Sequence, residues 1–257
     1  PPVLRTACVR PRQMCVLNEH SVPTRGREKG VAGIANAEIR NMVINLAARA
    51  NEHGITHFGI DDPRQGILHI VPPELGITQP GLLIVGADSH TSTHGAFGCL
   101  AFGVGATEMM HVMATQTIWQ RKPKAMRIEI DGALGFGVTA KDVILAVIAR
   151  VGAGGAAGHV IEYAGSTISA MSMEARMTVC NMSIEAGGRA GMIAPDATTF
   201  EYLANRPHEP AGAAWDDALI TWRALPSDAA AKFDKEVHID AAQLAPMVTL
   251  GTSPEHA

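Results

Sequence analysis

The sequence has 257 residues, of which 47% are hydrophobic and 18% are charged, and its formal net charge is −4. These proportions are typical of a globular protein with a sizeable core, and the absence of a basic stripe with interleaved aromatic residues excludes nucleic acid as an expected partner. The apolar runs stop well short of the roughly 18 residues that a membrane span needs, and residues 1–12 show no apolar stretch of signal-peptide type. We therefore expect a cytoplasmic chain that contacts no membrane.

Hydrophobic spacing and turn residues predict the elements in chain order, after a loop-rich stretch of about 35 residues. Helices are expected over residues 37–51, about 106–117, 139–151, 172–185, 196–205 and 215–225. Strands are expected over residues 57–60, 82–85, 125–130, 159–163 and 235–239, while 65–71 fits either type. The alternation of strand and helix predicts an α/β fold with largely parallel sheets. A basic, proline-containing stretch at 121–124 suggests two domains, 1–121 and 122–257.

Two local signals support this assignment. Thr139 is placed to cap the helix that follows it, with Asp142 at the third helical position, which is a shortened capping box. The four cysteines, Cys8, Cys15, Cys99 and Cys180, show no CxxC spacing and predict no disulfide framework in a chain of this length. We expect all four to be free thiols, and the apolar neighbours of Cys99 and Cys180 predict that these two are buried.

An acid, a hydroxyl and an imidazole follow the predicted strand at 82–85, as Asp88, Ser89 and His90. Ligands bind beyond the carboxyl ends of strands in open α/β sheets, and such a loop offers a proton donor with an orienting carboxylate. On these three residues alone, a loop stabilised by its own Asx and Ser/Thr hydrogen bonds is the simpler interpretation. A serine hydrolase is excluded more firmly, because Ser89 is not in a GxSxG elbow.

Other patterns suggest metals or phosphates but fit them poorly. The pairs His53 with His57 and His90 with His94 have the i,i+4 spacing of metal ligands on a helix. No HExxH motif accompanies them, and glycine lies inside the first pair and next to the second, so we expect no metal site there. The glycine clusters lack the GxGxxG and P-loop patterns and indicate turns and close packing.

Asn181 and Glu185 form the other notable cluster. On one helix over 172–185 they would share a face, one turn apart. A carboxylate at the C-terminal end of a helix is poorly placed for the helix dipole. Glu185 therefore needs another role, such as binding a cation, a cluster or a hydroxyl, unless it is an ordinary solvated glutamate.

Several blocks resemble the large subunits of the 3-isopropylmalate dehydratase family, in the aconitase superfamily. The blocks are HSVPT at 20–24, DPRQGILH at 62–69, residues 88–114, GVTAKD at 137–142, residues 180–195 and VTLGTSPE at 248–255. The strings DSHTSTHGAFG at 88–98 and MTVCNMSIEAG at 177–187 are the most specific. The resemblance runs from about residue 12 onward and implies aconitase-like α/β domains.

The resemblance implies an activity as well as a fold. The family isomerises 2-isopropylmalate and 3-isopropylmalate in leucine biosynthesis, by dehydration and rehydration. It uses a 4Fe-4S cluster in which one iron lacks a cysteine ligand and acts as a Lewis acid. A separate small subunit carries the swivelling domain, the base serine and the arginine that binds the substrate carboxylate. Related hydro-lyases act on homoaconitate, citraconate or 2-methylmalate, and dimethylmalate, and these substrates stay open for the present chain.

Residue by residue, the resemblance implies that Asp88, Ser89 and His90 contact the substrate and the cluster-bound water. The resemblance places His69 on the same side, facing the substrate and the cluster.

A second group of roles follows from the same resemblance. His20 would protonate the departing hydroxyl, oriented by the acid before it. Asn181 and Glu185 would lie near the cluster and bond the ligand and the iron-bound oxygen. The family usually has Asp-His-Asn where this chain has Glu19, His20 and Ser21. Glutamate is one methylene longer, so we expect it to orient His20 less well, and a shift of about 1 Å is costly in catalysis.

The cysteines depart from the family pattern. The family holds its cluster through three cysteines, one alone and two in a CxxC, and the resemblance places all three beyond residue 257. The chain also lacks an initiator methionine and the segment that precedes residue 12 in the family. We therefore expect a piece truncated at both ends, without the cluster-binding third domain, the cluster or isomerase activity of its own. The alternative is a cluster-free relic that acts as a binding or interaction module.

Overall fold

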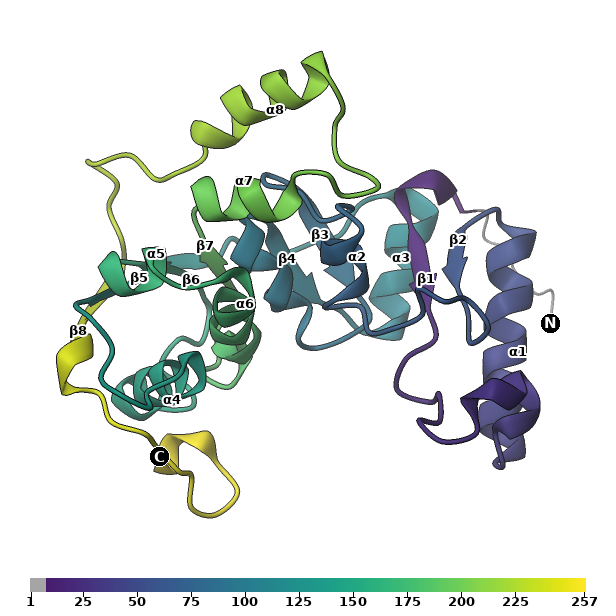
Figure 1. Ribbon diagram of the computed structural model, residues 1–257, viewed down its shortest axis with the longest axis horizontal. Helices are drawn as coiled ribbons and strands as arrows, with labels where there is room; N and C mark the ends of the chain where they lie inside the picture. Colours follow the sequence, from purple (N-terminus) through teal and green to yellow (C-terminus); the bar gives the residue numbers. More distant parts are fainter. Residues whose placement is uncertain (1–7) are drawn as a thin grey trace. The chain divides into compact units, whose positions relative to one another are not determined.

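The computed structural model describes residues 8–257, except for the side chain of Glu255, and Figure 1 shows their elements. Of these residues, one compact unit takes those up to Val71 together with Gly105–Gln120, and the other takes Pro72–Val104 with Arg121–Ala257. One unit boundary coincides with the division predicted near residue 121, but residues 72–104 pack with the second unit. The assignment of domains 1–121 and 122–257 stays a prediction. The expected absence of a signal peptide concerns residues 1–7 in large part, and these lie outside the described residues.

The first unit combines a helix with a small parallel sheet. Helix α1, Ala37–Glu52, begins where the Asn36 side chain accepts hydrogen bonds from two backbone amides, at 2.8 and 3.1 Å. Strands β1, Cys15–Leu17, and β2, Thr56–Phe58, pair in parallel. The remaining elements are the 3-10 helices Pro11–Gln13 and Arg27–Gly33 and helix α3, Ala106–Thr115.

The second unit contains two parallel sheets. Strands β3, Leu83–Gly86, and β4, Leu100–Gly103, form a pair joined by the 3-10 helix η3, Thr91–Phe97. The other sheet has the strand order β7-β6-β5-β8, with every pair parallel. Its strands are β5, Lys124–Asp131, β6, His159–Ala164, β7, Ala190–Ile193, and β8, Lys235–Asp240.

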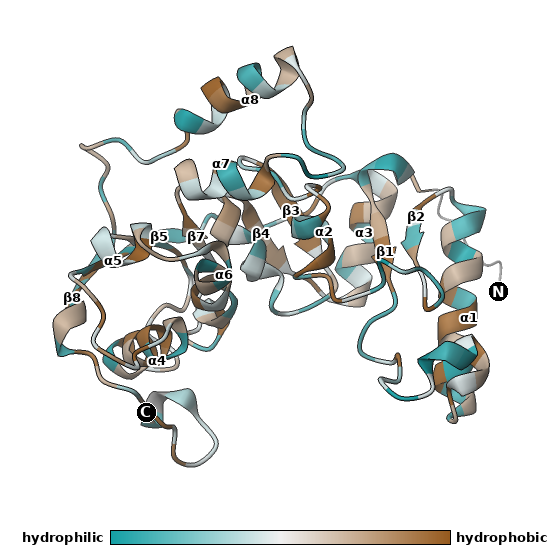
Figure 2. Cartoon of the chain, viewed as in Figure 1, coloured by the Kyte–Doolittle hydropathy of each residue, from teal (hydrophilic) through white to brown (hydrophobic). Residues whose placement is uncertain are grey.

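The helices of the second unit connect and cover these strands. They are α2, Val71–Glu74 (whose first residue belongs to the first unit), α4, Ala140–Val151, α5, Ser166–Ser169, α6, Met173–Asn181, α7, Ala197–Leu203, and α8, Ala213–Arg223. Short 3-10 helices occupy Met182–Ile184, Ala241–Gln243 and Pro254–His256. Apolar residues of α4, a helix whose ribbon is partly brown in Figure 2, join the core with Ile128 and Ile130 of β5 and with Ile161 of β6. Among the described residues, no helix is both long and apolar enough to cross a membrane.

The predicted α/β class with parallel sheets is confirmed, and most predicted helices and strands lie within a few residues of their expected bounds. Four expectations were wrong. Residues 65–71 are coil and turn until α2 begins at Val71, because the amide of Leu68 bonds the Glu19 side chain instead of a neighbouring strand. The first 35 residues, predicted as loop, contain β1. Strands β4 and β7 were not anticipated. The helix predicted over 172–185 ends at Asn181.

The predicted capping box at α4 is present in the structure. The Asp142 carboxylate accepts the Thr139 backbone N–H at 2.7 Å and the Thr139 hydroxyl at 2.6 Å. It also accepts the Met247 backbone N–H at 2.7 Å, which ties the C-terminal segment to the start of α4. These bonds hold the pKa of Asp142 below its usual value, and the bond from the Thr139 hydroxyl has the largest effect.

The lowered pKa of Asp142 in the folded chain determines how its contribution to stability changes with pH. The contribution of ionised Asp142 is present above its unfolded pKa of about 3.9 and is lost as the pH falls through the lower folded value. We expect Asp142→Asn to lower the free energy of unfolding by about 1–2 kcal/mol at pH 7. The difference from the wild-type chain should shrink below about pH 4 in urea titrations. Asp217→Asn, at an exposed position of α8, is the control, and a difference that stays constant down to pH 2.5 would contradict this role.

Candidate active site

The loop that follows β3 holds the first group of predicted site residues. Asp88 Oδ1 accepts the backbone N–H of His90 at 2.7 Å, and the Asp88 carbonyl accepts the Thr91 hydroxyl at 2.6 Å. The predicted self-stabilised turn is therefore present. It does not compete with a role in ligand binding, because these bonds leave the imidazole of His90 directed elsewhere.

A glycine in the neighbouring strand supports this loop. An added Cβ on Gly103 of β4 would lie 2.3 Å from the Asp88 carbonyl oxygen and 2.9 Å from the Cα of Ser89. The loop thus rests directly on the backbone of β4, which leaves no room for a side chain there.

His90 and Glu185 form an ion-pair contact in the second unit. Nε2 of His90 lies 2.9 Å from Oε1 of Glu185, and the two side chains are 33% and 28% exposed. When the ring is neutral, donation from Nε2 to the carboxylate leaves Nδ1 to accept the Ser89 hydroxyl, 3.0 Å away. The carboxylate therefore orients the imidazole and selects its tautomer, while both groups remain accessible to a ligand. The other Glu185 oxygen, Oε2, is buried without a protein hydrogen bond.

Asn181 lies beside the same loop. Its Nδ2 donates to the Thr93 hydroxyl at 2.9 Å. Because α6 ends at Asn181 and a 3-10 turn follows, Asn181 and Glu185 do not occupy one continuous α-helix as the sequence suggested. They still contact the same segment, one at Thr93 and the other at His90.

An ion pair between Arg176 and Asp196 stabilises the start of the segment that leads to Asn181. Arg176 of α6 is fully buried, and both of its terminal nitrogens lie 2.7 Å from the Asp196 carboxylate, which also caps α7. Burial raises the pKa of Asp196, but the Arg176 guanidinium outweighs it and holds the pKa below its usual value. The pair thus fastens α6 to α7 at the end opposite Asn181.

The first unit holds the other predicted residues, Glu19, His20 and His69. Glu19 Oε2 accepts the backbone N–H of Leu68 at 2.8 Å, so its carboxylate connects the segment of His20 to that of His69. The Glu19 Oε1 atom lies 4.0 Å from Nδ1 of His20, which is longer than a hydrogen bond. The glutamate thus aligns the backbone before His69 more directly than it orients the imidazole of His20.

Asn18 is a second link between these segments, and the sequence did not reveal it. Its side chain is buried, and its Oδ1 lies 2.8 Å from Nε2 of His57. The Asn18 carbonyl accepts a hydrogen bond from the Gln65 amide. Further along, the Arg64 guanidinium donates to Asp62 at 2.8 and 3.0 Å, and it holds the pKa of Asp62 at about 2.

The structure thus gathers the predicted residues into two sets, one on each unit. The set on the second unit comprises Asp88, Ser89, His90, Asn181 and Glu185. The set on the first unit comprises Glu19, His20 and His69, on two segments that share hydrogen bonds. An imidazole held by a carboxylate can give a proton to an oxygen or accept one, which is what general acid–base catalysis requires.

The cysteines do not fit an iron–sulfur cluster. Cys8 and Cys15 belong to the first unit and Cys99 and Cys180 to the second, so neither unit holds the three cysteines that the family resemblance implies. Cys99 and Cys180 are fully buried; burial raises the pKa of Cys99 to about 12 and also raises that of Cys180. The predicted burial of these two thiols is confirmed.

Three histidines of the i,i+4 pairs, His57, His90 and His94, contact separate partners. Nδ1 of His94 is 2.8 Å from the Thr78 hydroxyl, whereas His90 contacts Glu185. In the first unit, His57 contacts Asn18. These separate contacts differ from those of a metal site, in which two imidazoles are directed at one ion.

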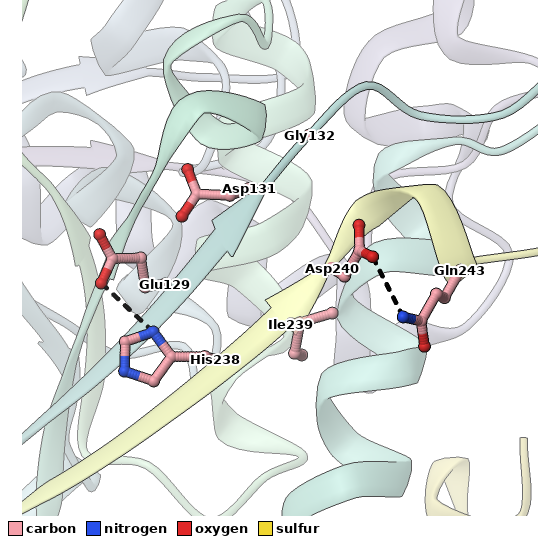
Figure 3. A pocket seen from close by; sticks show the side chains of 7 residues that line it. All are labelled: Glu129, Asp131, Gly132, His238, Ile239, Asp240 and Gln243. Carbon is pink, nitrogen blue, oxygen red and sulfur yellow. Dashed lines mark hydrogen bonds and ion pairs between the residues drawn. The ribbon is translucent and has the colours of Figure 1, made fainter.

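A separate hollow lies where β5 and β8 end, and Figure 3 shows its lining. It is lined by Glu129, Asp131, Gly132, His238, Ile239, Asp240 and Gln243. Its polar groups already bond one another or neighbouring groups: Glu129 with His238 at 3.4 Å, Asp240 with Gln243 at 3.0 Å, and Asp131 with Ser166 at 2.8 and 2.9 Å. None of the predicted site residues lines it, so the hollow is distinct from the candidate site.

Comparison with known proteins identifies the family. A model of the aconitase family (aconitate hydratase) matches residues 3–257. The chain belongs to the aconitase family. The resemblance seen in its motifs is therefore confirmed, over nearly the whole of the sequence.

Relatives of this aconitase-family chain carry a more specific name. It is 53% identical, over 246 residues, to the 3-isopropylmalate dehydratase large subunit of Roseiflexus castenholzii, and the match covers 95% of this chain and 52% of that protein. It is 52% identical, over 250 residues, to the 3-isopropylmalate dehydratase large subunit of Anaeromyxobacter dehalogenans, covering 95% of this chain and 51% of that protein. The chain thus spans about half the length of the curated relatives it matches.

The bond from Leu68 to Glu19 gives a prediction for the first unit. We expect Glu19→Ala to lower the free energy of unfolding by about 1–2 kcal/mol, because a partly buried amide loses a charged acceptor. The Leu68 amide should exchange its hydrogen faster, as measured by NMR. Glu52→Ala is the control, because Glu52 is 43% exposed in its ion pair with Arg49 and should cost less than about 0.5 kcal/mol. Unchanged exchange at Leu68 in Glu19→Ala would show that the bond is absent in solution.

Proposed function

We propose that this chain is the substrate-binding half of the large subunit of a hydro-lyase of the 3-isopropylmalate dehydratase type. The observation that carries the proposal is the His90–Glu185 pair, 2.9 Å apart, beyond the carboxyl end of β3. The two residues come from the two most family-specific strings of the sequence, which lie about 80 residues apart. Folding brings them together with Ser89 and Asn181 in one unit.

The reaction needs groups that bind a hydroxy-acid and a group that gives a proton to the departing oxygen. Dehydration removes a hydroxyl from one carbon and a proton from its neighbour, leaving a double bond, and rehydration returns water in the opposite sense. The departing oxygen needs a proton, and an oriented imidazole can supply it and recover it afterwards. In our proposal His90, held by Glu185, and Asp88, Ser89 and Asn181 bind the polar end of the hydroxy-acid. The family resemblance assigns the release of this proton to His20, which follows Glu19 in the first unit.

The remaining parts of the enzyme lie outside these residues in our proposal. The cysteines described above do not fit the 4Fe-4S cluster that the family implies, and we propose that its ligands come from residues outside this sequence. The relatives are called large subunits, and we propose a small-subunit partner for this chain as well. The substrate is then 2-isopropylmalate or 3-isopropylmalate, and the setting is leucine biosynthesis in the cytoplasm. A cluster-free binding module is the competing hypothesis.

A chimeric enzyme tests this function. The matching half of the Roseiflexus castenholzii large subunit is replaced by this chain, and the hybrid is produced with the small subunit of that organism. We expect the hybrid to interconvert the two isopropylmalates and the 257-residue chain alone to show no turnover. His90→Asn and Glu185→Gln in the hybrid should each lower kcat/KM by about 10²-fold, because the polar end of the hydroxy-acid is then held out of position.

Controls separate catalytic loss from loss of folding. Glu52→Ala, on the exposed surface of α1, should leave turnover unchanged in the same hybrid. A hybrid that binds iron and the small subunit but never turns over would favour the binding module. Full turnover in His90→Asn would refute the role assigned to His90.

A further inference from the structure

Ser92 lies two residues after His90, in the 3-10 helix η3, and is fully buried. Its hydroxyl donates to the backbone carbonyl of Cys180 at 2.8 Å and accepts the backbone N–H of Gly191 at 2.8 Å. The donor and the acceptor capacity of this one oxygen are thus both used by backbone groups about 90 and 100 residues away in the sequence.

These two bonds join three segments of the second unit. One segment carries His90, the second is the last turn of α6, which leads through a short 3-10 helix to Glu185, and the third is strand β7. Cys180 precedes Glu185 by only five residues, so a bond from Ser92 to its carbonyl limits how far the His90 segment can move from Glu185.

The same segments are packed against each other with no spare room. An added Cβ on Gly95, in η3, would lie 1.8 Å from the carbonyl oxygen of Gly191. The segment therefore cannot move toward β7, and the bonds of Ser92 oppose its movement away. The second tie, from Asn181 to Thr93, is only part-buried and is open to competition from water.

We propose that Ser92 is a positioning residue for the candidate active site. It sets the separation between the His90 and Glu185 segments through the Cys180 carbonyl and the Gly191 amide, and it thereby keeps Nε2 of His90 on the Glu185 carboxylate. This inference rests on the proposed function only where it treats His90 and Glu185 as parts of an active site. The claim that Ser92 sets the distance between them concerns the geometry of this chain alone.

Nuclear magnetic resonance of the 257-residue chain, with its histidines labelled with ¹⁵N, tests the proposal without any assay of turnover. The shifts of the two ring nitrogens report which nitrogen bears the proton and whether it is held in a hydrogen bond. In Ser92→Ala we expect the His90 nitrogen shifts to move toward those of a freely exchanging imidazole and the Gly191 amide to exchange faster.

Thr167→Val is the matched control. Thr167 is also buried in the second unit, and its hydroxyl donates to the Gly132 carbonyl at 2.7 Å, but it belongs to α5 and not to the segments of the pair. It should lower stability without changing the His90 shifts, which separates positioning from general destabilisation.

The outcomes are distinct. A folded Ser92→Ala chain with wild-type His90 shifts would overturn the proposal, as would an equal change of these shifts in Thr167→Val. Should Ser92→Ala fail to fold, Ser92→Cys takes its place with the same expected shift change, because a thiol forms only weak hydrogen bonds. Since no turnover is measured, failure of the hydro-lyase function would leave this result standing.

Discussion

The close approach of η3 to β7 is the constraint on which the candidate site depends. Gly95 and Gly191 meet with no room for a Cβ, 1.8 Å from the opposing carbonyl if one were added at Gly95. Every residue of η3 is buried as a result. The loop of His90, immediately before η3, is therefore attached to a rigid base of parallel strands and α6, and a site built on rigid elements keeps its geometry better than one on a free loop.

Two kinds of interaction then have different roles around these strands and α6. Polar side-chain contacts connect the supporting segments: fully buried Arg176 bonds Asp196 and so holds α6 to α7, and the part-buried amide of Asn181 donates to Thr93. The half-exposed groups, His90 and Glu185, stay available to a ligand while they orient each other. In the first unit, the Glu19 carboxylate holds the backbone at Leu68 more directly than it orients His20. Its bond to the Leu68 amide is 2.8 Å long, whereas its distance to Nδ1 of His20 is 4.0 Å.

Local signals in the sequence predicted local structure well. The cap of α4 by Thr139 and Asp142 and the start of α7 at Asp196 depend on residues three apart, and both were expected. Strand β7 was missed because Ala190–Ile193 becomes a strand only through its pairing with β6. Ser92 had no visible role, because its partners are backbone groups far away in the sequence. The roles of the site residues came from family motifs, and they stay predictions.

The candidate site depends most on the contact between His90 and Glu185 in solution. A double-mutant cycle with His90→Ala, Glu185→Ala and the double variant, followed by urea unfolding of this chain, measures their coupling directly. Because both side chains are about 30% exposed, we predict a favourable coupling of about 0.5–1 kcal/mol. Strictly additive effects, with a coupling indistinguishable from zero, would contradict the central claim that this fold holds the two residues together.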